Sequence, residues 1–292
     1  MSLHLSDKTV LANFSVSRWM GHRFDRKVTD EVNKAQNAAS DTGRYNKRLL
    51  PPGASSKVDA VTSAARTFHR MQTMPWMDDG VRILPATKYL EYAAKMKEFR
   101  QEFDEEVVGF LKAYPSHIET AKKRLGKMFN AADYPSANEL RKSFDWKLVI
   151  LPFPDADDFR VLSQGPELDE VKADLEARVA ALWDDAMKDT AERIVEVVGH
   201  MKEKLKGYKP GKGGKRAEGT FKDSLVGNVR ELADLLPGFN LTNDKKLGSL
   251  ITKIQKELCK HDAGLLRDDD KIRKRVAKSA DEVLTAVSDF MA

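Results

Sequence analysis

The sequence predicts a predominantly helical α+β protein with a small sheet. Amphipathic helix patterns cover most of the 292 residues, whereas only three or four segments alternate in the manner of a strand. One helix pattern, at residues 168–205, is unusually long. Because the strands are so few, the sheet must be small, and helices are expected to cover it.

The long helix is predicted from apolar or small side chains that recur every three or four residues. Eleven such positions span 37 residues, which gives 3.7 residues per turn, close to a straight helix and above the period of about 3.5 of a left-handed coiled coil. At about 1.5 Å per residue the helix would be roughly 55–60 Å long, so we expect it to contact more than one part of the fold. The positions are Leu168, Val171, Leu175, Val179, Leu182, Ala186, Thr190, Ile194, Val197, Met201 and Leu205, and in the middle the apolar face widens through Trp183, Met187, Ala191 and Val195.

A mixed body of strands and helices is predicted for residues 1–166. The helices on either side of Pro115 are expected to form an antiparallel hairpin, because proline favours the first turn of a helix. Strands are predicted at 9–19, 80–85, 146–153 and 158–162, and helices at 27–39, from Ser55 or Ser56 to Pro75, at 86–113, from Pro115 to 130, and at 136–144.

Three more helices are predicted near the C-terminus. Thr220 is the expected N-cap of the first and Pro237 its end, and Thr242 or Asn243 is expected to cap the second. The third is expected at 267–291, with the carboxylates of Asp268, Asp269 and Asp270 near the positive end of its dipole.

The expected organisation has four parts. They are the body at 1–166, the long helix at 167–206, a basic Gly/Lys-rich tether at 207–219, and a three-helix unit at 220–292. The pattern leaves open whether the three helices pack on the long helix or form a domain of their own.

Composition indicates an unexported cytoplasmic protein. The single cysteine, Cys259, excludes an intrachain disulfide and a cysteine-rich zinc site, as is typical of a reducing compartment. The N-terminus lacks the basic start and apolar core of a signal peptide, and no run of about 18 apolar residues occurs.

The net positive charge is concentrated in one segment. The chain carries a formal charge of +5, but residues 202–216 alone carry +6, which leaves −1 for the remainder. A flexible basic segment can grip a polyanion, because phosphate contacts release counterions without demanding exact geometry. The candidate phosphate contacts are Lys204, Lys206, Lys209, Lys212, Lys215 and Arg216.

Two further basic clusters lie beside aromatic residues. Arg23 and Arg26 flank Phe24 and follow Trp19, and Arg44, Lys47 and Arg48 surround Tyr45. Such pairs can grip phosphates and stack on unpaired bases, although we expect Trp19 and Phe24 to be core residues. A third basic stretch, residues 271–278, is interpreted as balancing the aspartates before it.

Catalytic motifs are largely missing from the sequence. The glycine- and lysine-rich segment 209–215 lacks the terminal hydroxyl of a P-loop, no Gly-x-Ser-x-Gly occurs, and the six histidines form no His-x-x-x-His pair. Asp155, Asp157 and Asp158 are a weak candidate for a metal-dependent phosphodiesterase site, but a solvated turn after Pro154 explains them more simply. We expect no cofactor, and we favour a non-enzymatic protein.

Four short segments resemble a set of uncharacterised bacteriophage proteins that are known only as a domain of unknown function. These segments are residues 14–21, 80–85, 110–114 and 133–144, so the resemblance covers roughly residues 1–165. It implies a phage-encoded cytoplasmic protein, sometimes encoded near AAA+ ATPases, and it implies no catalytic residue.

Two functional hypotheses follow. The first is a phage-type protein that binds single-stranded DNA or RNA through the basic tether, in replication, recombination or genome handling. The second is an oligomeric assembly protein, or an adaptor for an AAA+ ATPase, with no nucleic-acid role. Neither hypothesis involves a membrane.

Overall fold

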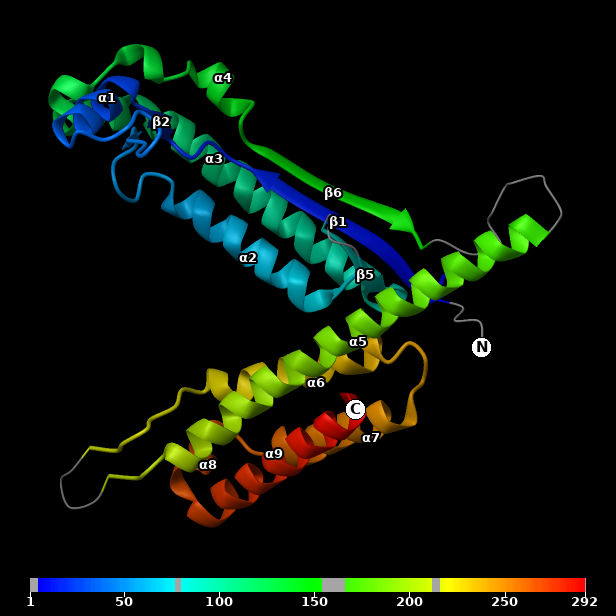
Figure 1. Cartoon of the computed structure of the whole chain (residues 1–292). Helices are drawn as coiled ribbons and strands as arrows, with labels where there is room; N and C mark the ends of the chain where they lie inside the picture. The colour runs from blue at the N-terminus through cyan, green and yellow to red at the C-terminus, as the bar shows by residue number, and fades with distance from the viewer. Residues whose placement is uncertain (1–4, 77–79, 154–165, 212–215, 292) are drawn as a thin grey trace. The chain divides into compact units, whose positions relative to one another are not determined.

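The computed structural model confirms a predominantly helical α+β protein with a small sheet (Figure 1). It describes residues 5–76, 80–153, 166–211 and 216–291. These residues form two compact units. Unit 1 contains the described residues of 1–13, 71–90 and 150–292, and unit 2 contains those of 14–70 and 91–149. The predicted strand at 158–162 lies outside the described residues.

The main sheet has four strands in the order β4-β5-β1-β6. β1 (Thr9–Ser17) runs antiparallel to β5 (Val81–Pro85), with Thr9 opposite Pro85 and Asn13 opposite Val81, and β5 runs antiparallel to β4 (Met74–Pro75). β6 (Asp145–Pro152) is the other edge strand. Three of these four strands, β1, β5 and β6, lie in segments where the sequence predicts a strand, and only the two-residue β4 does not.

Two helices, α2 (Ser56–Gln72) and α3 (Tyr89–Leu125), form the core of unit 2 together with strand residues of β1 and β6. Phe68 on α2 lies against the rings of Tyr92 and Phe99 on α3, at centroid distances of 5.9 and 5.8 Å. The ring centroids of Phe103 on α3 and Trp146 on β6 are 5.4 Å apart. The apolar stripes that predicted the two helices are therefore the surfaces that meet.

The predicted hairpin at Pro115 is wrong, because α3 continues through this proline as one helix of 37 residues. The buried stripe runs on both sides of the proline, with Phe110 and Tyr114 before it and Ala121 and Leu125 after it. The Tyr114 hydroxyl also donates a hydrogen bond to the Pro135 carbonyl at 3.1 Å. Packing of this long stripe outweighs the cost of one missing backbone hydrogen bond.

Replacing Pro115 with Ala is expected to stabilise the protein by about 1–3 kcal/mol, because proline inside a helix costs about 3 kcal/mol relative to alanine. Urea unfolding followed by circular dichroism would measure the change. Ser116→Ala, at the exposed neighbouring position, serves as the control and should leave the midpoint nearly unchanged. A lower midpoint for Pro115→Ala would show that the packing requires the proline.

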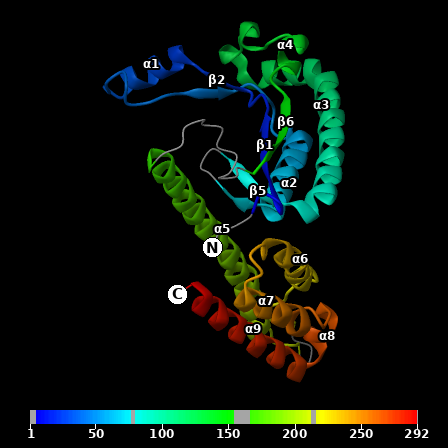
Figure 2. The same cartoon turned by 90° about the vertical axis from the view of Figure 1, so that its right-hand side faces the viewer.

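Unit 1 is built around the long helix α5 (Pro166–Gly207), which confirms the expected helix. The C-terminal helices are α6 (Ser224–Phe239), α7 (Lys245–Lys253) with a π-helical continuation (Ile254–Leu258), α8 (Ala263–Asp268) and α9 (Asp270–Met291). Of these helices, α6 and α9 pack directly on the second half of α5 (Figures 1 and 2), and α7 and α8 pack on these two, so the alternative left open by the sequence is decided in favour of packing on the long helix.

The core of unit 1 confirms most of the predicted stripe on α5. Ala186, Ile194, Met201 and Leu205 are buried, whereas Val195 is 43% exposed. The side chains of Leu168, Val171 and Leu175 are outside the described set. Arg193 donates to the carbonyls of Met71 (3.1 Å) and Thr73 (2.8 Å), so α5 also contacts the chain that enters β4.

The C-terminal helices begin at aspartates rather than at the predicted threonines and asparagine. Asp244 caps α7 by accepting from the Leu247 amide, and Asp269 accepts from the amides of Lys271 and Ile272 at the start of α9. Asn243 cannot be the cap, since its φ of 54° is left-handed. α6 begins after Asp223 instead of Thr220 and includes Pro237 in its last turn.

Candidate nucleic-acid interface

Two basic segments that are far apart in sequence lie side by side in unit 1. The C-terminal end of α5 carries Lys202 and Lys206, and both ammonium groups contact one carboxylate of α9, Asp281, at 2.6 and 2.5 Å. The hydrogen bond from Lys202, which has the larger effect, and the one from Lys206 hold the pKa of Asp281 below its ordinary value. The C-terminal end of α5 and the helix that carries the basic stretch 271–278 therefore lie against each other.

A groove of about 270 Å³ separates the end of α5 from α9. Lys206, Arg273, Lys274 and Lys278 line it together with Asp270 and Asp281, so the lining has a net charge of +2. Lys274 contacts Asp270 at 2.8 Å, which confirms that part of the 271–278 stretch balances the preceding aspartates. We call this groove the α5–α9 surface. The predicted phosphate contact Lys204 is partly buried on α5 and is not among the residues that line the groove.

Arg273 has a structural position at the floor of this surface. Its side chain is 4% exposed, and its guanidinium donates to the carbonyls of Leu266 (3.1 Å) and Arg267 (3.2 Å) and pairs with Asp270. The guanidinium also lies 5.0 Å from the ring centroid of Tyr208, at the end of α5. Arg273 thus joins α8, α9 and the chain after α5, and its donors are used by the protein.

The predicted tether has paired ends. Lys209 and Glu218 form an antiparallel bridge with two backbone hydrogen bonds of 3.0 Å, and their side chains pair at 3.3 Å. The Tyr208 ring packs edge-on against the Phe221 ring, with a centroid distance of 5.2 Å. Arg216 is exposed, while Lys212 and Lys215 lie outside the described residues. The segment starts and ends within unit 1.

The second group of candidate residues lies on unit 2, in a two-stranded ribbon. β2 (His22–Phe24) pairs antiparallel with β3 (Asn46–Arg48), and α1 (Arg26–Ala35) lies between them in the chain. The sequence analysis predicted no strand at β2 or β3 and so missed this ribbon. Three-residue strands separated by a helix have no long alternation and no contiguous turn to signal them.

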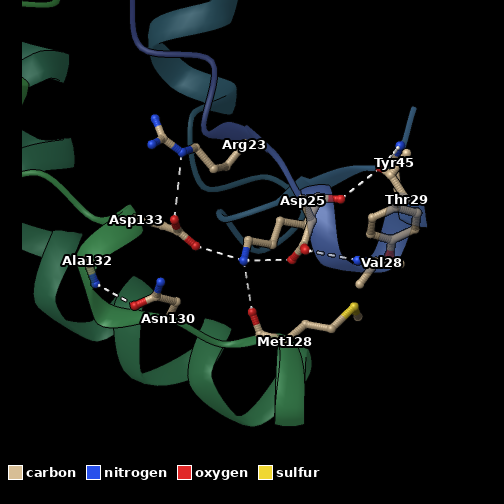
Figure 3. A network of polar contacts seen from close by, with 10 residues as sticks. Arg23, Asp25, Val28, Thr29, Tyr45, Met128, Asn130, Ala132 and Asp133 are labelled. Carbon is tan, nitrogen blue, oxygen red and sulfur yellow. Dashed lines mark hydrogen bonds and ion pairs between the residues drawn. The ribbon is translucent and has the colours of Figure 1, made fainter. Parts of the chain in front are cut away.

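Lys47 is the buried centre of a polar network with Asp25, Asp133 and Met128, and Figure 3 shows these three partners around it. Its side chain is 7% exposed, and its ammonium contacts Asp25 at 2.9 Å, Asp133 at 2.8 Å and the carbonyl of Met128 at 3.0 Å. Arg23 approaches Asp133 from the other side, at 3.7 Å. The ammonium of Lys47 is thus occupied inside the protein, and we assign it no phosphate contact.

Ion pairing shifts the pKa values in this network. The pKa of Asp25 is lowered mainly by the hydrogen bond from Lys47, with a further bond from the Val28 amide that caps α1. Burial lowers the pKa of Lys47, but the two carboxylates outweigh burial and the net shift is upward. Both groups are therefore held in their charged forms.

The outer face of the ribbon carries an exposed aromatic residue. The prediction that Phe24 is a core residue is wrong, because it is 38% exposed, with the Arg44 guanidinium 4.7 Å from its ring centroid. Trp19 is partly buried against the cluster of Leu49 and Leu125, as expected. Arg26 is exposed and lies 3.9 Å from Asp30 on α1.

No metal site is apparent in the described residues. Within them, no three His, Cys, Asp or Glu side chains are grouped closely enough to hold a metal ion. Asp155, Asp157 and Asp158 are outside this part of the chain. Burial raises the pKa of the Cys259 thiol, which disfavours the reactive thiolate.

Comparisons with family models, characterised proteins and solved structures found no significant match to this chain. Among the helices of the described residues, none combines the length and apolar character needed to cross a bilayer.

Proposed function

We propose that this protein binds nucleic acid, with the α5–α9 surface as its main phosphate contact. The observation that carries the proposal is the position of Lys202 and Lys206 on the same carboxylate of α9, Asp281. The apolar core shared by α5 and α9 holds the end of α5 against α9, so lysines from both helices line one groove. The proposed role is non-enzymatic.

A polyanion fits this surface better than a small neutral ligand. Four of the nine residues that line the groove are basic, and the basic segment after α5 begins at its edge. Phosphates along a strand can contact such dispersed lysines in turn, and each contact releases counterions. The proposed process is genome replication, recombination or handling.

Neutralising the α5–α9 surface is expected to weaken oligonucleotide binding roughly tenfold or more at low salt. The variant carries Lys206→Gln, Lys274→Gln and Lys278→Gln in the full chain. Fluorescence anisotropy with a labelled single-stranded oligonucleotide would measure Kd across a salt series. The slope of log Kd against log salt should fall by about 0.7 for each phosphate that the variant no longer neutralises.

A matched control separates this site from bulk charge. It replaces three exposed lysines of α3 in unit 2 with glutamine, namely Lys97, Lys112 and Lys122. Equal reductions of affinity in the two variants would contradict a specific surface. If the wild-type protein binds no oligonucleotide and light scattering finds a defined oligomer or an ATPase complex, the assembly hypothesis replaces the proposal.

A further inference from the structure

The β2–β3 ribbon has two chemically different faces. His22 lies opposite Arg48 and Phe24 opposite Asn46, whereas Arg23 lies opposite Lys47. Residues directly opposite each other in an antiparallel pair share a face, and so do residues two apart on one strand. The two outer pairs of this register therefore form one face, and the central pair of Arg23 and Lys47 forms the other. We call the face with His22, Phe24, Asn46 and Arg48 the ribbon face. All four of these residues are exposed.

The opposite face of the ribbon is anchored to unit 2. Lys47 is fixed there by Asp25, Asp133 and the Met128 carbonyl, and Arg124 of α3 donates to the carbonyls of Arg48 (2.6 Å) and Leu50 (2.7 Å). A two-stranded ribbon is marginally stable alone, so these bonds explain how it persists. They also hold the ribbon face in place before any ligand arrives.

Tight packing at the start of the ribbon adds to this anchoring. The Gly21 carbonyl accepts a 2.7 Å hydrogen bond from the Leu49 amide, next to β3. Gly21 has a φ of 60°, and a Cβ atom there would lie 2.7 Å from Cγ of Leu50. Only glycine allows the chain to enter β2 at this distance from Leu50.

The ribbon face combines the groups that recognise unpaired bases. Phe24 offers an exposed ring with the Arg44 guanidinium over it, and both ring and guanidinium planes stack on bases. Arg48 supplies a charge for the phosphates, and the Asn46 amide can both donate and accept hydrogen bonds. We propose that the ribbon face binds unpaired bases of a single-stranded nucleic acid by stacking on Phe24 and Arg44.

This inference goes beyond the α5–α9 surface, since it concerns unit 2 and the bases rather than the phosphates. It rests on the proposed function for the class of ligand. Its signature is a preference for strands that carry bases over strands of equal charge without them. Phosphate contacts alone give no such preference.

The test compares two probes with the full-length protein. One is a labelled single-stranded oligonucleotide, and the other is the same backbone with abasic positions throughout. We expect the wild-type protein to bind the first probe at least about fivefold more tightly, as one stacked base provides. Phe24→Ala should remove most of this preference while leaving the affinity for the abasic probe unchanged.

Conservative variants and a folding control sharpen the test. Phe24→Tyr keeps a ring and should retain the preference, whereas Phe24→Leu keeps only apolar area and should lose it. Thermal unfolding of each variant checks that unit 2 is intact. A photo-crosslink from a halogenated pyrimidine in the first probe is expected on the ribbon face, with the adduct mapped by mass spectrometry.

The possible outcomes separate the two proposals. If Phe24→Ala binds both probes as the wild type does, the ribbon inference is overturned and the α5–α9 surface is unaffected. If the lysine variant of the α5–α9 surface binds normally while Phe24→Ala loses the base preference, the ribbon inference holds and the proposed phosphate surface fails. Absence of binding to either probe by the wild type overturns both.

Discussion

Replacing Lys47 with Met is expected to destabilise the protein by about 3–5 kcal/mol, the usual cost of breaking a buried ion pair from one side. Methionine keeps most of the apolar stem but removes the ammonium that lies between Asp25 and Asp133. Those carboxylates have side chains only 13% and 10% exposed and would face each other without a cation. Urea unfolding followed by circular dichroism would measure the decrease in stability.

Two controls define the cause. Arg48→Gln, at the exposed next position of β3, should change the free energy of unfolding by less than about 0.5 kcal/mol. Combining Lys47→Met with Asp25→Asn and Asp133→Asn should restore much of the stability, because asparagine is neutral and still caps α1 at position 25. A triple variant no more stable than the single one would contradict the electrostatic explanation.

The stability difference between wild type and Lys47→Met should also depend on pH. Lys47 lowers the pKa of Asp25 from its ordinary 3.8, so this contribution is present above about pH 4 and is lost as the pH falls through the lower folded-state pKa. The pKa of Lys47 is raised from 10.5, so its contribution is present below that pH and is lost as the pH rises through the raised folded-state pKa. A difference that stays constant below pH 4 would contradict the network.

Replacing Arg273 with Met is expected to cost roughly 2–4 kcal/mol. The change leaves the Leu266 and Arg267 carbonyls without the donor they share and removes the cation above the Tyr208 ring. Because Arg273 joins α8, α9 and the end of α5, the substitution should lower the thermal midpoint of unit 1. Differential scanning calorimetry would measure it.

A neighbour on the same helix provides the comparison. Arg275→Gln removes an equal charge from an exposed position of α9 and should leave the midpoint nearly unchanged. The folded Arg273→Met protein should bind oligonucleotide more tightly than the α5–α9 lysine variant, since the donors of Arg273 are already used. A large decrease in affinity without a decrease in stability would mean that Arg273 contacts the ligand instead.

Periodicity predicted the helices well wherever one face is continuously apolar. The spacing of α5 is visible in its own residues, and so are the alternations of β1 and β6. The end of a helix is harder to predict, as Pro115 and Pro237 show, because packing on either side of a proline can outweigh its local cost. The predicted N-caps of the C-terminal helices were wrong by a few residues, because several polar residues near the start of each helix could act as the cap.

The candidate sites were predicted as residue types and not as arrangements. The sequence indicates that residues 202–216 are basic, but it gives no sign that Asp281 pairs with Lys202 and Lys206. It likewise marks Lys47 and Phe24 as a basic and an aromatic residue. It does not indicate that Lys47 is buried between two carboxylates or that Phe24 is exposed.

The sequence alone determined the fold class, the long helix, most of the strands and the concentration of positive charge in one segment, because each is a local property of spacing or composition. Only the tertiary structure decided that the C-terminal helices pack on α5, that α9 adds lysines to the basic segment, and that a ribbon forms from β2 and β3. These depend on long-range contacts, in which a side chain's partners are set by the fold and not by its neighbours in the chain.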